Sequence, residues 1–293
     1  MLVFSGSSNK PLAKKIAQKS GMEMGKIELS RFANDEARVR VLEKKLSKRV
    51  VVIQSMSVSS DHFLIEFMLI CDGLKKLGVK QITGVIPWLC YSKQDKVFRK
   101  GEPLSVQVIA KILDTIGLKK IIFFDLHNPE IIRMFKTKII NLSALDLMVD
   151  YFRKQADEET VVVAPDIGGI KLSKQFAKNL GVKCALINKS RDLVSGEVTV
   201  KSIQGKVRNK KVLIIDDLLA TGNTLIETAK YLNKLQVQSI KVGVTHHLYL
   251  PKVQKKIDES GISELVVTDS IKQSVKSNKL KLLSIADLIL KEV

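Results

Sequence analysis

Short apolar runs alternate with longer amphipathic stretches along the whole chain. Runs such as 50–54, 161–164 and 212–215 are rich in valine, isoleucine and leucine, which is typical of strands buried on both faces of a parallel sheet. Stretches such as 63–77 and 171–180 repeat their apolar residues at helical spacing. This alternation predicts an α/β protein built from mostly parallel sheets flanked by helices.

The pattern predicts ten strands and a smaller set of helices between them. We expect strands at 3–4, 38–41, 50–54, 82–86, 121–124, 161–164, 184–187, 212–215, 239–244 and 265–268. We expect helices at 12–19, 63–77, 104–116, 145–154, 171–180 and from Leu225 onward, with a strand and a helix within 280–290.

Polar or glycine-bearing loops follow nearly every predicted strand, where ligands bind in parallel α/β sheets. The motifs Asp125-Leu126-His127 and Asp216-Asp217-Leu218 lie at what we interpret as equivalent strand ends in the two halves, which indicates a duplicated domain. We therefore expect an N-terminal domain at 1–145 and a C-terminal domain at 146–293. The last segment of the second domain is a candidate for packing on the first.

The composition suits a globular protein of two domains. The 293 residues are 45% hydrophobic and 27% charged, and no apolar run approaches the roughly 20 residues of a membrane span. The first residues lack the basic and apolar regions of a secretion signal, and the three cysteines are scattered without metal-like spacing. These features predict a cytoplasmic protein that does not contact a membrane.

The charge is strongly positive, with 49 Lys+Arg against 30 Asp+Glu and a formal net charge of +19. Such an excess favours either nucleic acid or small polyanions as ligands. The lysines are spread along the chain, with no long basic block and no interleaved aromatic residues. We therefore expect small polyanionic substrates and no nucleic acid, with a nucleic-acid binder as one alternative.

The stretch 211–228 carries the clearest chemistry. Its apolar run precedes the carboxylates Asp216 and Asp217, which we expect at the end of a strand. The small, hydroxyl-rich turn 220–224 follows and leads into a helix, so free N–H groups and the positive end of the helix dipole face one place.

The residue types in this stretch predict a sugar-phosphate site. Gly222 allows the backbone to approach a ligand closely, and Thr221 and Thr224 add hydroxyl donors. Asp216 and Asp217 can accept hydrogen bonds from sugar hydroxyls or hold a hydrated metal ion. The alternative is an ordinary turn with a capping threonine and two solvated acids.

This stretch resembles the phosphoribosyl-diphosphate motif of type I phosphoribosyltransferases, which include base-transferring enzymes and the synthetases that make the diphosphate. Further motifs, in order along essentially the whole chain, resemble the ribose-phosphate pyrophosphokinase family. They are Tyr91-Ser92-Lys93-Gln94-Asp95, Gly101-Glu102-Pro103-Leu104-Ser105, Asp125-Leu126-His127, Pro165-Asp166-Ile167-Gly168-Gly169 and Lys189-Ser190-Arg191, before the motif at 216–224. The tandem arrangement favours the synthetase and implies two phosphoribosyltransferase-like domains.

The resemblance implies transfer of the β,γ-diphosphoryl group of ATP to the anomeric hydroxyl of ribose 5-phosphate, with AMP as the second product and Mg²⁺ as cofactor. It implies that Asp216 and Asp217 hold the ribose hydroxyls and that Ala220, Thr221, Gly222, Asn223 and Thr224 cradle the 5-phosphate. It assigns Asp166, Gly168 and Gly169 to a diphosphate loop, and His127 and Asp166 to the metal. The alternatives are a strand-end residue for His127 and a helix cap for Asp166.

The resemblance also implies a nucleotide site and a catalytic pair. Lys189 and Arg191 would lie in a mobile loop that closes over the triphosphate; the alternative is two solvated basic residues. The implied ATP-binding residues are Phe32, Asn34, Glu36, Lys93, Gln94, Asp95 and His127. The loop at 32–36 reaches a neighbouring subunit's site in this family, which implies a homodimer or a higher homo-oligomer.

The chain departs from the family pattern at a few positions. The family's Phe-x-Asp-Gly-Glu loop has Asn34 in place of the Asp and Asp35 in place of the Gly, and Lys93 and Lys96 stand where arginines are usual. These changes bear on the adenine contacts and the preference for ATP. A catalytically silent regulatory homologue and a base-transferring phosphoribosyltransferase are the remaining alternatives.

Overall fold

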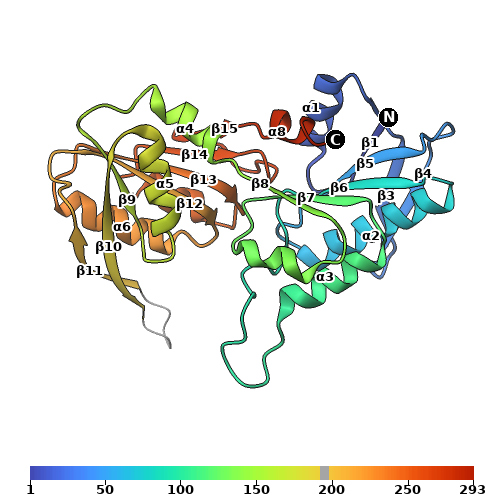
Figure 1. Cartoon of the computed structure of the whole chain (residues 1–293), viewed down its shortest axis with the longest axis horizontal. Helices are drawn as coiled ribbons and strands as arrows, with labels where there is room; N and C mark the ends of the chain where they lie inside the picture. The colour runs from blue at the N-terminus through green and yellow to red at the C-terminus, as the bar shows by residue number, and fades with distance from the viewer. Residues whose placement is uncertain (192–197) are drawn as a thin grey trace. The chain divides into compact units, whose positions relative to one another are not determined.

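The chain divides into two compact units, described here from a computed structural model (Figure 1). The structure describes residues 1–191 and 198–293, with the backbone alone at 189–191 and 198–201. Unit 1 comprises Met1–Ser143, Asp269–Lys272 and Ser284–Val293. Unit 2 comprises Ala144–Thr268 and Gln273–Leu283. No helix among the described residues is long and apolar enough to cross a membrane.

Unit 1 is built on a six-stranded parallel sheet in the order β2-β1-β5-β6-β7-β8. Its strands are β1 (Leu2–Ser5), β2 (Glu23–Met24), β5 (Arg49–Ile53), β6 (Gln81–Val85), β7 (Lys120–Phe124) and β8 (Ile139–Leu142). Its helices are α1 (Lys10–Ser20), α2 (Ser60–Lys76), α3 (Ser105–Thr115), the 3-10 helix η1 (Pro129–Met134) and α8 (Ala286–Leu290). A separate antiparallel hairpin joins β3 (Ile27–Arg31) to β4 (Ala37–Val41).

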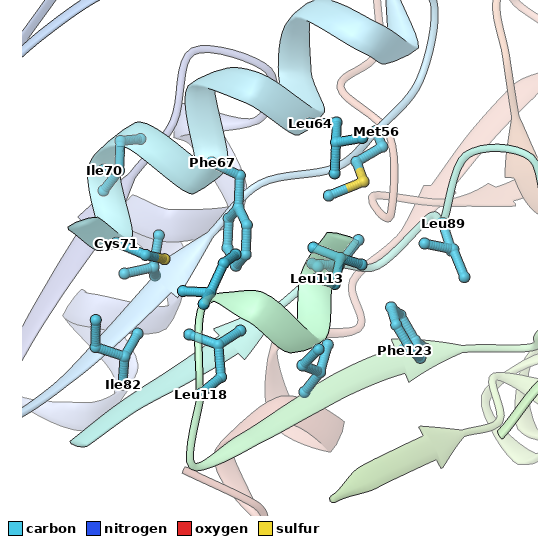
Figure 2. Close-up of a cluster of buried hydrophobic side chains, with 14 of the residues drawn as sticks. Met56, Leu64, Phe67, Ile70, Cys71, Ile82, Leu89, Leu113, Leu118 and Phe123 are labelled. Atoms are coloured by element: carbon cyan, nitrogen blue, oxygen red, sulfur yellow. The ribbon is translucent and has the colours of Figure 1, made fainter. Parts of the chain in front are cut away.

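The main core of unit 1 lies between the sheet and helices α2 and α3. Phe67 of α2 and Leu113 of α3 are fully buried against Ile82 of β6 and Phe123 of β7 (Figure 2). A Cβ on Gly84 of β6 would lie 3.0 Å from Cζ of Phe67, so glycine allows the helix to pack closely on the strand. Apolar residues repeat at helical spacing on α2 because this one face is buried.

Unit 2 has a seven-stranded sheet among the described residues, in the order β11-β10-β9-β12-β13-β14-β15. The strands are β9 (Thr160–Ala164), β10 (Lys183–Arg191), β11 (Val198–Gln204), β12 (Lys211–Leu219), β13 (Ser239–His247), β14 (Glu264–Thr268) and β15 (Leu280–Leu283). The helices are α4 (Leu145–Arg153), α5 (Ile170–Leu180), α6 (Asn223–Lys234) and α7 (Val253–Asp258). Helices α4 and α5 pack on one face of the sheet, where the rings of Phe152 and Phe176 meet edge to face with centroids 5.9 Å apart.

The two sheets repeat one strand order. Without the antiparallel edge strand β11, the order β10-β9-β12-β13-β14-β15 has the same pattern as β2-β1-β5-β6-β7-β8. The predicted fold of tandem, mostly parallel sheets is confirmed. However, β12 corresponds to β5, and β7 corresponds to β14, so the strand ends at Asp125 and Asp216 are not equivalent as predicted. Composition alone places both acidic motifs after strands, and only the strand order shows which strand ends correspond.

Two strands run further than the sequence predicted. Strand β12 continues through Asp216 and Asp217 to Leu219, because Leu218 and Leu219 pair with His246 and His247 of β13. Strand β10 continues to Arg191, because it pairs with β11 in an antiparallel hairpin. The prediction that the two acids follow the end of their strand is therefore wrong, as is the prediction of a loop at Lys189 and Arg191.

The C-terminal residues of the chain pack on unit 1. Helix α8 contacts α1, and Nζ of Lys19 lies 2.6 Å from a carboxylate oxygen of Asp287. In segment 269–272, the Asp269 carboxylate pairs with Lys15 at 2.7 Å, and its backbone oxygen accepts a hydrogen bond from the Asn9 side chain at 2.8 Å. These contacts fix segment 269–272 and the C-terminal helix on unit 1.

Candidate active site

Three carboxylates come together at the carboxyl ends of two neighbouring strands in the middle of the unit 2 sheet. Asp166 follows β9, and Asp216 and Asp217 lie in β12, the neighbouring parallel strand. The negative charges of Asp217 and Asp166 both act on Asp216. The Asp217 N–H donates a hydrogen bond to Oδ1 of Asp216 at 2.9 Å. Unit 2 thus brings residues of the predicted diphosphate loop close to the predicted ribose site.

The pKa of Asp216 is raised well above its ordinary value. Burial is the largest cause, the neighbouring Asp217 carboxylate is the next, and the charge of Asp166 adds to them. A hydrogen bond from the Asp217 N–H acts in the opposite direction. A cluster with surplus carboxylates favours a ligand that donates hydrogen bonds or brings positive charge, such as sugar hydroxyls or a hydrated cation.

The turn after β12 forms the N-terminus of α6. Gly222 is the residue before the helix and has φ 76°, a conformation that glycine adopts without strain. No side chain among the described residues caps this helix end, where the first N–H groups of α6 belong to Asn223 and Thr224. Thr221 and Asn223 are exposed, and Ala220 and Thr224 are partly exposed. The predicted phosphate-cradle residues therefore surround one helix N-terminus.

The loop after β9 is closed by a side-chain contact just before α5. Oδ1 of Asp166 accepts a hydrogen bond from the N–H of Gly169 at 2.9 Å, at the start of α5. A Cβ on Gly168 would lie 3.3 Å from the same oxygen, so the loop is tight. Gly169 is the residue before α5, and no described side chain caps the helix itself, so this contact closes the turn that leads into the helix. The diphosphate and metal roles of Asp166, Gly168 and Gly169 remain predictions.

Lys189 and Arg191 lie near the end of strand β10, where the hairpin with β11 begins. The register shifts between Asn188 and Lys189, which marks a bulge or irregularity in the ladder. Only the backbone of Lys189 and Arg191 is described, so their side-chain roles remain predictions. The rest of the predicted loop, 192–197, lies outside the described residues.

The β3–β4 hairpin of unit 1 carries three predicted ATP-binding residues at its tip. Phe32, Asn34 and Glu36 are all exposed, with 52% of Phe32 accessible, and the turn is closed by the Phe32 N–H on the Glu36 carbonyl at 2.9 Å. Asp35 has φ 69°, so it takes a backbone conformation that suits the glycine of the family pattern. Oδ1 of Asp35 lies 2.6 Å from Nη1 of Arg31, which holds this conformation.

The loops after β6 and β7 are joined by a side-chain contact. Nδ2 of Asn128 donates to Oδ2 of Asp95 at 2.8 Å. Asn128 directly follows His127, so the structure brings the predicted residues Asp95 and His127 to one place in unit 1. Lys93, Gln94 and His127 are exposed, and Gln94 accepts a hydrogen bond from the Ser105 hydroxyl at 2.6 Å.

Asn128 was not among the residues that the sequence singled out. Its Oδ1 also accepts the N–H of Glu130 at 3.0 Å and caps the 3-10 helix η1. The Asn128-Pro129 pair after His127 is the sequence signal for such a helix start. One side chain therefore both caps a helix and holds Asp95.

The loop after β1 in unit 1, which corresponds to the loop after β9 in unit 2, already holds internal partners. The N–H and hydroxyl of Ser7, after β1, donate to Oε1 of Glu66 at 2.7 and 2.8 Å. The N–H and hydroxyl of Ser8 donate to Oε1 of Gln54 at 3.1 and 2.6 Å. An internal carboxylate thus occupies the place that an external anion would take in this loop.

The two predicted metal residues, His127 and Asp166, belong to different units. Among the described residues, no group of three or more His, Cys, Asp or Glu side chains is arranged to hold a metal ion. Mg²⁺ commonly uses only one or two protein carboxylates and completes its shell with water and substrate phosphates. The carboxylates of unit 2 fit that kind of site, because all are oxygen donors and Asp216 has surplus negative charge around it.

Comparison with known families covers most of the chain. Residues 1–117 match the N-terminal domain of ribose phosphate pyrophosphokinase, and residues 136–277 match the phosphoribosyl transferase domain. A ribose-phosphate pyrophosphokinase of Fusobacterium nucleatum is 33% identical over 287 residues, which cover 97% of this chain and 90% of that protein. The chain belongs to the ribose-phosphate pyrophosphokinase family. It is therefore an enzyme, a transferase of nucleotide biosynthesis with phosphoribosyltransferase-type domains.

Further members of the family show the same extent of similarity. A ribose-phosphate pyrophosphokinase of Bacillus caldolyticus is 34% identical, covering 98% of this chain and 91% of that protein. The crystal structure of phosphoribosylpyrophosphate synthetase from Mycobacterium smegmatis matches with a TM-score of 0.91 at 29% identity, over 99% of this chain and 96% of that one. Membership in this family also implies a general requirement for a divalent metal ion. The predicted identity is confirmed at the level of the family, and the individual site residues remain predictions.

Proposed function

We propose that this chain transfers the β,γ-diphosphoryl group of ATP to the anomeric hydroxyl of ribose 5-phosphate, giving 5-phosphoribosyl 1-diphosphate and AMP. The observation that carries the proposal is the acid-rich strand β12 leading into the N-terminus of α6, in a chain with full-length similarity to ribose-phosphate pyrophosphokinases. The product supplies activated ribose for nucleotide biosynthesis.

The two units divide the work. Unit 2 holds ribose 5-phosphate: the carboxylates Asp216 and Asp217 accept hydrogen bonds from the ribose hydroxyls, and the α6 N-terminus binds the 5-phosphate through residues 220–224. Unit 1 supplies the nucleotide loops. The loop after β1 in unit 1 already donates hydrogen bonds to Glu66 and Gln54, which supports one phosphoribosyl site per chain.

ATP is held by loops of unit 1. Gln94, Asp95 and His127 lie on the loops that Asn128 joins, and the exposed ring of Phe32 offers a stacking surface for adenine. Because Phe32 projects at a hairpin tip, the adenine site is completed by the hairpin of a second copy of the chain. This arrangement requires a homodimer or a higher homo-oligomer.

Little covalent chemistry is required of the protein, because phosphoryl-type transfer depends on positioning and charge neutralisation. The ribose-binding carboxylates orient the anomeric hydroxyl toward the β-phosphorus. Lys189 and Arg191 stabilise the negative charge that develops on the transferred group and on the leaving AMP. The diphosphate loop, with Asp166, Gly168 and Gly169, receives the transferred group.

Mg²⁺ is the cofactor that suits the donor set. When bound, it neutralises charge on the ATP phosphates. The family resemblance assigns Asp166 and His127 to the metal, and the Asp166 carboxylate is an oxygen donor of the kind that Mg²⁺ prefers. We place the enzyme in the cytoplasm, where ATP and ribose 5-phosphate are its ligands, and assign no role to nucleic acid or membranes.

The test is AMP formation from ATP and Mg²⁺, with and without ribose 5-phosphate, in wild type, Lys189→Ala and Lys183→Ala. Lys183 is an exposed lysine at the start of the same strand β10, so it is a matched control. We expect AMP that depends on ribose 5-phosphate, with kcat reduced by about 100-fold or more in Lys189→Ala and unchanged in Lys183→Ala.

Each other outcome changes a specific part of the proposal. Equal loss in both variants would mean that Lys189 acts only through general charge. Binding of ribose 5-phosphate without AMP formation in the wild type would indicate a silent regulatory homologue.

A further inference from the structure

A buried histidine lies at the end of strand β13, beside the turn proposed above to bind the 5-phosphate (220–224, the phosphate turn). His247 is the last residue of β13 and is fully buried. Its Nδ1 accepts the backbone N–H of Tyr249 at 3.0 Å, and the two rings stack with centroids 4.1 Å apart. Because Nδ1 is an acceptor, the ring proton is on Nε2, which donates to Oε1 of Gln254 at 3.3 Å. Both ring nitrogens of His247 therefore have defined partners.

The hydrogen bonds continue from His247 across helix α7. Nε2 of Gln254 donates to Oδ1 of Asp258 at 2.9 Å, and the same carboxylate oxygen accepts the Ser277 hydroxyl at 2.8 Å. Gln254 is almost fully buried, and all four residues belong to unit 2. Helix α7 has only six residues, and a helix this short depends on tertiary contacts to form. The chain of polar groups from His247 to Ser277 therefore holds α7 in place.

Helix α7 and His247 both lie against the phosphate turn. Leu219, the residue before the turn, is paired with His247 in the parallel ladder, and its carbonyl accepts the Leu248 N–H at 3.0 Å. Val253 is the first residue of α7, and a Cβ on Gly222 would lie 3.4 Å from its Cγ1. Val253 therefore packs beside Gly222, directly before the first N–H groups of α6.

The surroundings keep the His247 ring neutral. Burial lowers the pKa of His247 to about 4, while hydrogen bonding to Gln254 and to the Leu219 backbone acts in the opposite direction. The imidazole is thus within reach of the residue that precedes the phosphate turn. A neutral ring can accept from Tyr249 and donate to Gln254 at the same time, which a protonated ring cannot do.

We propose that His247 is a positioning residue for the phosphate turn. Its hydrogen bond to Gln254 sets where α7 lies, and α7 in turn places Val253 against Gly222. The inference rests on the proposed function, because that function supplies ribose 5-phosphate as the ligand of the turn. A loosened turn would present the N–H groups of α6 less accurately to the 5-phosphate. Affinity for ribose 5-phosphate would then fall, while ATP binding by the loops of unit 1 would not change.

Two substitutions of His247 separate the two hydrogen bonds of its ring. The amide of His247→Gln extends to the place of Nε2 and can still donate to Gln254. The shorter His247→Asn keeps an acceptor for the Tyr249 N–H and loses the bond to Gln254. In calorimetric titration with ribose 5-phosphate, we expect a Kd within about twofold of wild type for His247→Gln and about tenfold higher for His247→Asn.

Gln254→Met breaks the same link from the other side with a side chain of similar size. We expect Kd and KM for ribose 5-phosphate to rise by about tenfold, with KM for ATP unchanged. Tyr151→Phe is the matched control, because it removes the 2.9 Å hydrogen bond from Tyr151 to Glu264, the first residue of β14. That bond lies at the opposite end of the parallel strands, so both constants should keep their wild-type values.

The remaining outcomes separate this role from the proposed function. An unchanged Kd in both His247→Asn and Gln254→Met, or an equal rise in Tyr151→Phe, would overturn the positioning role and leave the proposed function intact. An equal rise in KM for ATP would overturn it in favour of a general structural role. A wild type that does not bind ribose 5-phosphate would overturn the proposed function, and the positioning role with it.

Discussion

The backbone N–H of Ser7 donates a 2.7 Å hydrogen bond to the Glu66 carboxylate, in a loop of unit 1 whose counterpart in unit 2 is the predicted diphosphate loop. The Ser7 hydroxyl and the Gln54 amide donate to the same oxygen at 2.8 and 2.6 Å. Glu66 is almost fully buried. The duplicated fold therefore has one copy of the loop closed by its own carboxylate.

Removing that carboxylate should destabilise unit 1 without affecting ribose 5-phosphate binding. Glu66→Ala removes the acceptor of three donors, two on the partly buried Ser7 and one on the buried Gln54, and we expect the free energy of unfolding to fall by about 2–3 kcal/mol. Urea denaturation measures it. Glu23→Ala, at an exposed position in β2, should change stability by less than about 0.5 kcal/mol. A loss of ribose 5-phosphate affinity in folded Glu66→Ala would contradict a phosphoribosyl site in unit 2 alone.

Asp216→Asn should raise stability and weaken ribose 5-phosphate binding. The folded-state pKa of Asp216 is raised, so the fold favours the protonated form, and its contribution to stability falls as pH rises from the ordinary value through the raised one. At neutral pH the neutral amide removes the cost of burying a charged carboxylate. We expect the free energy of unfolding, measured by thermal unfolding, to rise by on the order of 1 kcal/mol. Asn donates as well as accepts, so the Kd for ribose 5-phosphate should rise by about tenfold or more.

Asp146→Asn provides a control of opposite sign. Asp146 is an exposed acid in the first turn of α4, where it interacts favourably with the helix dipole, so its removal should lower stability by about 0.5 kcal/mol. A loss of stability in Asp216→Asn similar to that in Asp146→Asn would show that the carboxylates of β12 do not repel one another.

Gly222→Ala should weaken phosphate binding through the backbone. At φ 76° an alanine is strained, and the expected cost is about 1 kcal/mol with displacement of the α6 N–H groups. Gly73→Ala is the matched change within helix α2, where a Cβ would meet only Val41 at 3.6 Å; there alanine should stabilise the helix by about 0.5–1 kcal/mol. Calorimetric titration with ribose 5-phosphate measures the Kd of both variants. The Kd should rise in Gly222→Ala and stay unchanged in Gly73→Ala, which would show that the effect comes from the turn and not from replacing any glycine.

His247 should make the protein sensitive to mild acid. Burial lowers its pKa to about 4, while hydrogen bonding to Gln254 acts in the opposite direction. The unfolded state therefore binds the proton more tightly, so stability is fully present above about pH 6.5 and falls as pH decreases toward 4. Between pH 6.5 and 4, the free energy of unfolding in urea should change less steeply with pH in His247→Gln than in the wild type. The two slopes should differ by up to about 1.4 kcal/mol per pH unit. An unchanged slope would show that His247 is not the responsible group.

Local sequence pattern predicted most of the strands and helices because burial on one or both faces is written in residue periodicity. It did not predict how far β12 and β10 extend. Asp216 and Asp217 remain in a strand because β13 continues beside them, and β10 reaches Arg191 because β11 pairs with it. These pairings are tertiary, and a polar stretch alone gives no signal for them.

The candidate site was predicted where one motif contains all its parts, as at 216–224. The internal closure by Glu66 could not be predicted, because Ser7 and Glu66 are separated by 59 positions and neither lies in an unusual motif. The link from Asn128 to Asp95 likewise depends on two loops meeting after separate strands. To predict such contacts, the order of the strands in the sheet must be known, and residue periodicity does not give that order.

The central claim is tested most directly by the phosphorus spectrum of the products formed from ATP, Mg²⁺ and ribose 5-phosphate. Diphosphoryl transfer predicts AMP and a sugar 1-diphosphate in equal amounts, with neither product formed when ribose 5-phosphate is omitted. Formation of ADP with a singly phosphorylated sugar position, or of AMP without ribose 5-phosphate, would contradict it.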